Sequence, residues 1–206
     1  TVCEIAEQPR GRVIDCVDEV LSWQQDYASI IERLTEAETK LVTITVTEKG
    51  YCLDHRGGLN VDDEDIKRDL KRRFMDLSSS TPPATTLPGM LCDAAWQRMQ
   101  KGMPSLTIIS CDNLSSNGKS LKGALLEFAA LADEQLGSWM EQHLHCPNTV
   151  VDCIVPRVTA EQVQRVQSTL DIDDEVPVLC EPFRQWVIAS KELEDSPAWA
   201  LAGAEL

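Results

Sequence analysis

The sequence has 206 residues, enough for one large domain or two small ones. Hydrophobic residues make up 43% and charged residues 26%, which is typical of a soluble globular protein. The 34 Asp and Glu residues outnumber the 19 Lys and Arg residues and give a formal net charge of −15, which opposes broad electrostatic binding to nucleic acid or anionic membranes. No apolar run approaches the roughly 18 residues of a membrane span, and no secretory signal is visible, so we expect a cytoplasmic protein.

The first half of the chain is predicted to begin with an antiparallel strand pair and to continue with alternating helices and strands. Residues 1–6 and 12–17 form the predicted pair. A helix is predicted at 26–38, and the β-branched run at 41–46 is typical of a buried strand. A helix that begins acidic and ends basic follows at 61–77, which suits the helix dipole.

The basic end of the helix at 61–77 has two interpretations. Its cations are Lys67, Arg68, Lys71, Arg72 and Arg73. The favoured interpretation is a solvated helix face, and the alternative is a contact with a phosphate or a partner.

The second half is predicted to contain three helices and four short strands. The helices span 89–100, 121–144 and 159–170, and the strands span 105–110, 149–151, 176–179 and 186–188. Thr159 is the predicted cap of the last helix. Because helices separate the apolar strands, the pattern predicts an α/β fold with a mainly parallel sheet and flanking helices.

The eight cysteines indicate neither a disulfide framework nor a metal site. They lie at positions 3, 16, 52, 92, 111, 146, 153 and 180, with no C-x-x-C pair. We interpret them as reduced, buried thiols of a cytosolic protein. The grouping His143-Leu144-His145-Cys146 matches no common zinc spacing, so no metal is predicted.

A polar cluster follows each of the three central strands. These clusters contain Glu48, Asn113 and Asp152. Ligands of open parallel sheets bind outside the carboxyl ends of the strands, so the three side chains are expected to converge on one crevice. A carboxylate there can accept a proton or bind a sugar hydroxyl, and an amide can polarise a carbonyl oxygen. The alternative is that these polar residues only end strands and cap the helices that follow.

Motifs that would name a cofactor or a nucleophile directly are absent from the sequence. No glycines have G-x-G-x-x-G spacing. Residues 117–120 (Asn-Gly-Lys-Ser) imitate the end of a phosphate loop, but Asn113 stands where that loop needs glycine, so we interpret them as a turn that opens a helix. No histidine stands beside a Ser or Cys in a hydrolase motif.

Four segments of the chain resemble one enzyme family. They are Thr-Val-Thr-Glu-Lys-Gly-Tyr-Cys at 45–52, Ser-Cys-Asp-Asn-Leu at 110–114 with Asn117-Gly118 after it, Val-Asp-Cys-Ile-Val-Pro at 151–156, and Cys-Glu-Pro-Phe-Arg-Gln-Trp-Val-Ile at 180–188. In this order they resemble the long-chain mannitol dehydrogenase family, most closely its mannonate oxidoreductase (fructuronate reductase) branch. The resemblance covers nearly the whole chain.

The resemblance implies an oxidoreductase that passes hydride from a secondary alcohol of a polyol or aldonate to NAD without a metal, with NADP left open. Glu48 then matches the glutamate that helps to carry the proton to solvent, and Asn113 matches the asparagine that binds the reacting oxygen. Asp152 matches the aspartate that contacts substrate near the nicotinamide, and Thr47 and Val151 are assigned to the cofactor. The implied partner is a small sugar acid or polyol, with neither nucleic acid nor membrane.

Three departures from the family pattern matter. Cys153 stands where the family usually has arginine, which changes the surroundings of Asp152. The family's Gly-rich first unit and its helical C-terminal domain, which supplies the catalytic lysine, are not found in the sequence. We therefore expect residues 1–190 to form an incomplete Rossmann-like domain and 191–206 to begin a connection to the helical domain. Hydride transfer needs cofactor and base together, so the chain alone is expected to be inactive.

Two other functions remain open at this point. One is a truncated, non-catalytic α/β module for binding or assembly, and the acidic charge and Cys153 favour it slightly. The other, within the family, is mannitol 2-dehydrogenase. The sequence fixes neither the sugar nor the oligomeric state.

Overall fold

The computed structural model describes residues 2–4, 10–12, 16–72, 74, 82–171, 173–183, 185–189 and 198–202. The chain divides into two compact units, each described by itself below. The large unit comprises Leu21–Val151 and Trp186–Leu206, and the small unit comprises Thr1–Val20 and Asp152–Gln185. The domain bounds expected from the sequence stay a prediction.

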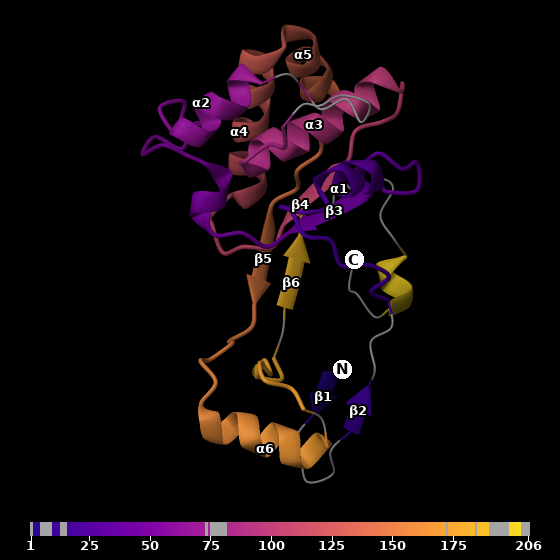
Figure 1. The fold of residues 1–206 in the computed structure, drawn as a ribbon, viewed down its shortest axis with the longest axis vertical. Helices are drawn as coiled ribbons and strands as arrows, with labels where there is room; N and C mark the ends of the chain where they lie inside the picture. Colours follow the sequence, from indigo (N-terminus) through magenta and orange to yellow (C-terminus); the bar gives the residue numbers. More distant parts are fainter. Residues whose placement is uncertain are drawn as a thin grey trace. The chain divides into compact units, whose positions relative to one another are not determined.

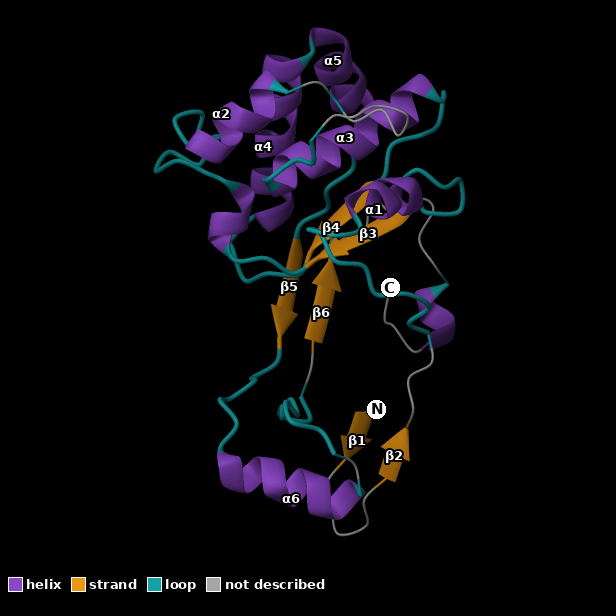
Figure 2. Cartoon of the chain, in the orientation of Figure 1, coloured by secondary structure: helices purple, strands orange, loops and turns teal. Residues whose placement is uncertain are grey.

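A pair of parallel strands lies at the centre of the large unit (Figure 2). Strand β3 (Leu41–Ile44) pairs with β4 (Thr107–Ser110), with Ile44 opposite Ser110. On the other edge of β4, Thr107 forms a parallel bridge with His145. That chain leads into β5 (Thr149–Asp152), which pairs with β6 (Gln185–Ile188). The predicted parallel α/β arrangement is confirmed.

Helices of the large unit pack around α4. Figure 1 shows α3 (Leu87–Gln100), α4 (Asn117–Ala132) and α5 (Glu134–His143) gathered beside α2 (Glu64–Lys71). Helix α4 contacts α2, α3, α5 and β4, and α1 (Tyr27–Leu34) contacts α3. The fully buried side chains Leu121, Leu125, Phe128, Leu136 and Met140 belong to one hydrophobic core. Burial of this apolar surface is the main force that holds the large unit together.

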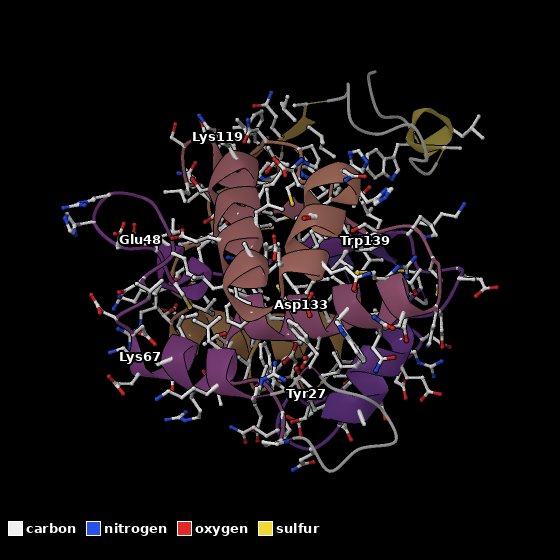
Figure 3. The ribbon with its side chains drawn as sticks, turned by 90° about the horizontal axis from the view of Figure 1, so that it is seen from above. Tyr27, Glu48, Lys67, Lys119, Asp133 and Trp139 are labelled. Carbon is white, nitrogen blue, oxygen red and sulfur yellow. The ribbon has the colours of Figure 1, made fainter. Side chains whose placement is uncertain are left out.

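The single long helix predicted at 121–144 is wrong, because the structure has two helices there. Asp133 has an extended backbone (φ −159°, ψ 119°) and ends α4. Its side chain accepts a hydrogen bond from the backbone N–H of Leu136 at 2.8 Å and so caps α5. A Cβ atom on Gly137 would lie 2.8 Å from the Cα of Ala130, so glycine permits close packing of the two helices. Asp133 can be found at this corner in Figure 3.

The solvated interpretation of the basic helix end is confirmed for Lys67 and Arg68 but wrong for Arg72. Lys67 and Arg68 form exposed ion pairs within α2. The Arg72 side chain is only 7% exposed and lies 2.9 Å from a carboxylate oxygen of Asp93, which also accepts a 2.6 Å hydrogen bond from the Tyr27 hydroxyl. A buried cation needs such partners because desolvation is costly. Arg73 lies outside the described residues.

Asp69 extends this buried charge network. Its carboxylate lies 3.6 Å from Arg72 Nε. It accepts hydrogen bonds from the backbone N–H and hydroxyl groups of Thr85 and Thr86, at 2.7–3.1 Å. The network therefore joins α2 to the start of α3, where Thr86 is the N-cap.

The described residues of the small unit form one strand pair and one helix. The predicted antiparallel pair is confirmed between β1 (Val2–Glu4) and β2 (Arg10–Arg12), although β2 lies earlier than the expected 12–17. Helix α6 (Ala160–Leu170) begins with the predicted Thr159 cap, in a reciprocal capping box with Gln162.

The predicted strand at 176–179 is wrong. These residues adopt no regular structure, and Val176 and Val178 are exposed. Pro177 lacks the N–H that a sheet ladder needs, and its ring is buried.

The helices predicted at 26–38 and 61–77 and the strands predicted at 41–46 and 105–110 are present but shorter than expected, whereas α3, β5 and β6 extend beyond their predicted bounds. Short 3₁₀ helices follow β3 (η1, Glu48–Tyr51) and end the described chain (η3, Trp199–Ala202). None of the helices in the described ranges is long and apolar enough to cross a membrane.

The prediction that the cysteines are buried thiols is only partly right. None of the seven cysteines with described side chains forms a disulfide. Cys92 and Cys146 are buried in the large unit, but Cys16, Cys153 and Cys180 are exposed.

Candidate active site

The first polar cluster leaves the carboxyl end of β3 through a tight turn. Thr47 is extended and precedes η1, and Glu48 is the first residue of that helix; both are exposed. A Cβ atom on Gly50 would lie 2.8 Å from the Cβ of Val46, so glycine lets η1 fold back against the end of the strand. The sequence Glu-Lys-Gly-Tyr therefore presents Glu48 to solvent while it directs Tyr51 inward (Figure 3 labels Glu48).

Tyr51 connects this turn to the segment that follows β4. The Tyr51 hydroxyl is fully buried and hydrogen-bonded to the Ser110 hydroxyl, which donates to Asp112 Oδ1 at 3.3 Å. The same Asp112 oxygen accepts from the backbone N–H of Leu114 at 3.2 Å. Burial raises the pKa of Tyr51 above its usual range, so its phenol stays neutral and serves as a positioning group.

Asn113 lies in the loop between β4 and α4, directly after Asp112, and its side chain is exposed. Because Ile44 pairs with Ser110 in a parallel ladder, the segments that carry Glu48 and Asn113 leave the sheet at the same edge. The structure therefore brings the first two predicted segments together. The catalytic roles of Glu48 and Asn113 stay predictions.

Asn117 holds the loop after β4 against the start of β5. Its side-chain N–H groups donate to Thr149 Oγ1 at 2.9 Å and to the backbone oxygen of Asp112 at 3.2 Å. Its side-chain oxygen accepts from the backbone N–H of Thr149 at 2.9 Å. Thr149 Oγ1 in turn donates to the backbone oxygen of Ser110. This fully buried amide therefore fixes the ends of two neighbouring strands relative to each other.

The start of α4 packs closely against the backbone of residues 146–148. A Cβ atom on Gly118 would lie 2.3 Å from the backbone oxygen of Pro147 and 2.4 Å from that of Cys146. The backbone N–H of Lys119 donates to Asn148 Oδ1 at 3.0 Å, which satisfies one group of the helix N-terminus. The interpretation of 117–120 as a turn that opens a helix is confirmed, since α4 begins at Asn117.

The third polar cluster spans the boundary between the two units. Val151 is half-buried and is the last residue of the segment Leu21–Val151 of the large unit, whereas Asp152 is exposed and belongs to the small unit. The expected approach of Asp152 to Glu48 and Asn113 therefore stays a prediction. Within the small unit, the third and fourth motifs meet, because Ile154 and Glu181 are joined by two hydrogen bonds.

Sequence reasoning missed Tyr51, Asn117 and Thr149 as residues that shape this edge. Tyr51 and Asn117 stood inside the quoted motifs, but their contacts lie 59 and 32 residues away in the chain. In the part of the chain that the structure describes, no three His, Cys, Asp or Glu side chains gather in a way that could hold a metal ion.

The sequence of this chain is similar to a known protein family and to individual members of it. A family model described as the mannitol dehydrogenase Rossmann domain matches residues 2–201. The chain is 36% identical over 202 residues to D-mannonate oxidoreductase of Escherichia coli, covering 97% of this chain and 40% of that protein. It is 37% identical to D-arabinitol 4-dehydrogenase of Ralstonia nicotianae, covering 94% of this chain and 40% of that protein.

Two solved structures have a fold similar to that of this chain. Mannitol 2-dehydrogenase of Pseudomonas fluorescens, in a ternary complex with NAD and D-mannitol, superposes with a TM-score of 0.82 at 35% identity, covering 97% of this chain and 39% of that one. Substrate-free D-sorbitol dehydrogenase superposes with a TM-score of 0.77 at 30% identity, covering 88% of this chain and 36% of that one. The chain thus spans about two fifths of the length of these proteins.

Proposed function

Because the chain belongs to the mannitol dehydrogenase family, we propose that it is the Rossmann portion of an NAD-dependent oxidoreductase acting on a sugar acid or polyol. The reaction is the interconversion of a secondary alcohol and its ketone, of the mannonate/fructuronate type. One observation carries the proposal: the segments with Glu48 and Asn113 leave one edge of a parallel sheet, and the Tyr51–Ser110–Asp112 contacts hold them together. We also propose a cytoplasmic location.

Glu48 and Asn113 have roles that suit their exposed positions after β3 and β4, and Asp152 takes its role from the motif resemblance. The Asn113 amide donates a hydrogen bond to the reacting oxygen, which favours the charge that develops there. The exposed Glu48 carboxylate passes the alcohol proton to water, and Asp152 accepts a hydrogen bond from a substrate hydroxyl.

The same edge fits a nicotinamide cofactor, which when bound supplies the hydride acceptor. Dinucleotides bind outside the carboxyl ends of parallel strands, and Thr47 follows the carboxyl end of β3. We assign Val151, near the end of β5, to the cofactor as well. Thr47 is exposed and its hydroxyl does not cap η1, which leaves the hydroxyl available to a ligand. We propose NAD as the cofactor, with NADP as the alternative.

The substrate proposal rests on motif resemblance more than on overall identity. Identity to D-mannonate oxidoreductase (36%) and to the solved mannitol 2-dehydrogenase (35%) differs too little to decide. The whole protein should therefore be assayed with mannonate, mannitol and arabinitol by following NADH absorbance. A preference of tenfold or more in kcat/KM for mannonate supports the sugar-acid branch, and the reverse preference favours mannitol 2-dehydrogenase.

Substitution of Asn113 tests the assignment of the active edge. In the whole protein, Asn113→Ala should lower kcat about 100-fold or more, because one donor to the developing oxyanion is lost. Asn60→Ala is a matched control, since the Asn60 side chain accepts a local hydrogen bond from the backbone N–H of Asp62, and it should leave kcat unchanged. Unchanged turnover in Asn113→Ala contradicts the assignment.

The alternative of a non-catalytic binding module is favoured by the acidic net charge and by Cys153, which stands where the family resemblance implies arginine. Calorimetry on the 206-residue chain and an assay of the whole protein separate the two functions. We expect weak or no NAD binding and no turnover by the 206-residue chain, and turnover by the whole protein. Micromolar NAD affinity of the chain alone contradicts the first expectation, and an inactive whole protein favours the binding module.

A further inference from the structure

Cys153 and Cys180 lie in two segments of the small unit that run side by side. The backbone N–H of Glu181 donates to the backbone oxygen of Ile154 at 3.1 Å, and the N–H of Ile154 donates to Glu181 Oε1 at 2.8 Å. Each cysteine directly precedes one of these two bonded residues. The Cys153 sulfur also lies 4.0 Å from the backbone oxygen of Glu181. These contacts therefore place Cys153 and Cys180 on neighbouring segments of the small unit.

Both thiols are accessible, and Cys180 is near enough to influence the proton of the Cys153 thiol. Desolvation, followed by the charge and hydrogen bond of Cys180, raises the pKa of the Cys153 thiol. Both residues are exposed, unlike Cys92, whose thiol is buried against the backbone oxygen of Leu125. Accessibility and proximity both favour oxidation to a disulfide.

We propose that Cys153 and Cys180 are an oxidation site, at which a low-molecular-weight disulfide such as oxidised glutathione drives formation of a reversible intramolecular disulfide. One cysteine thiolate attacks the glutathione disulfide, and a first reduced glutathione leaves with the proton of that thiol. The second cysteine then attacks the protein sulfur of the mixed disulfide and releases a second reduced glutathione. Two protein S–H bonds are lost, one S–S bond forms, and two glutathione thiols are produced.

The position of the cross-link gives it a structural consequence. It closes a loop that contains α6 and ties the segment after β5 to the segment before β6. It also fixes the backbone next to Asp152. An effect on substrate binding rests on the proposed function, whereas the existence of the bond does not.

Peptide mapping of the 206-residue chain tests the proposal. After incubation with oxidised glutathione, we expect a linked peptide pair containing Cys153 and Cys180, a loss of two titratable thiols, and full reversal by dithiothreitol. Formation of the link should not depend on protein concentration, because the reaction is intramolecular. The readout is the bond itself, so its failure is distinct from failure of the enzymatic proposal.

Variants decide whether the pair is specific. Cys153→Ser and Cys180→Ser change exposed positions, and each should abolish the linked peptide and leave a glutathione adduct on the remaining cysteine. Cys16→Ser removes another exposed thiol and should leave the linked peptide unchanged. Separate glutathione adducts on Cys153 and Cys180, a link to Cys16, or a disulfide-linked dimer would each overturn the proposal.

Discussion

The two units of the chain differ in how much they bury. In the large unit, Phe128, Leu121 and Ile109 are completely buried in or beside a core that joins five helices and two strands. In the small unit, Val166 and Pro177 are the buried residues among the described part of 152–185, and Val176 and Val178 are 80% and 72% exposed. The first two family motifs thus lie on a well-packed scaffold, and most of the last two lie on a thinly packed one.

This difference teaches where rigidity in the candidate site comes from. The edge with Glu48 and Asn113 is fixed by buried hydrogen bonds of Tyr51 and Asn117, which water does not reach. Segments with few buried apolar contacts open at low free energy. We therefore expect the large unit to carry most of the stability and the small unit to respond to local changes, including the proposed disulfide.

The largest expected effect comes from a cavity in the large unit. Phe128→Ala should lower the free energy of unfolding by about 4 kcal/mol, through lost burial and an unfilled cavity. All five tryptophans belong to the large unit, so urea unfolding followed by tryptophan fluorescence reports on that unit. Val166→Ala in the small unit should leave this transition unchanged. Equal shifts from the two variants would show that the units do not differ in this way.

A somewhat smaller effect is expected from the buried charge network. Asp93→Asn removes the nearer of the two carboxylate charges that face Arg72 but keeps an acceptor for Tyr27, and should destabilise the large unit by about 3 kcal/mol. Asp65→Asn is a matched control, because the Asp65–Arg68 pair is exposed, and it should cost below about 1 kcal/mol. The same fluorescence measurement applies, and a small effect at Asp93 would mean that the Arg72 charge finds water.

Asn117→Ala should cost about 2 kcal/mol, because it leaves the backbone N–H of Thr149 and the carbonyl of Asp112 without their buried partner. In the whole protein it should also lower kcat, since the loop with Asn113 loses its anchor to β5. The substitution Asn60→Ala serves again as the control for both measurements. Lost stability with unchanged kcat would show that Asn117 is not needed to position the edge.

Local patterns in the sequence predicted the elements well, and distant contacts explain what they missed. The β-branched run at 41–46 and the intervening helices were enough to predict parallel strands, and the family resemblance of the four motifs is confirmed. The break at Asp133 was missed because the apolar stripe continues across it from Leu125 to Trp139. The burial of Arg72 was missed because its partner Asp93 comes 21 residues later. The site roles of Glu48, Asn113 and Asp152 stay predictions, since they depend on a bound substrate.

The smallest expected effect is a pH dependence at the rim of the large unit. Burial, followed by the charges of Asp63, Asp69 and Asp65, raises the pKa of the half-buried Cys52 thiol to about 11. The folded chain therefore holds this proton more tightly than the unfolded chain, whose thiol has the ordinary value of 9.0. The resulting stability is fully present below pH 9 and is lost as the pH rises toward 11. The free energy of unfolding, measured with urea, should consequently fall less over this pH window in Cys52→Ser than in the original chain.

Alkylation of Cys52 should also be slow at pH 9 when the chain is folded and fast when it is unfolded in urea. Equal alkylation rates in both states would show that water reaches the rim of the large unit as freely as it reaches the small unit.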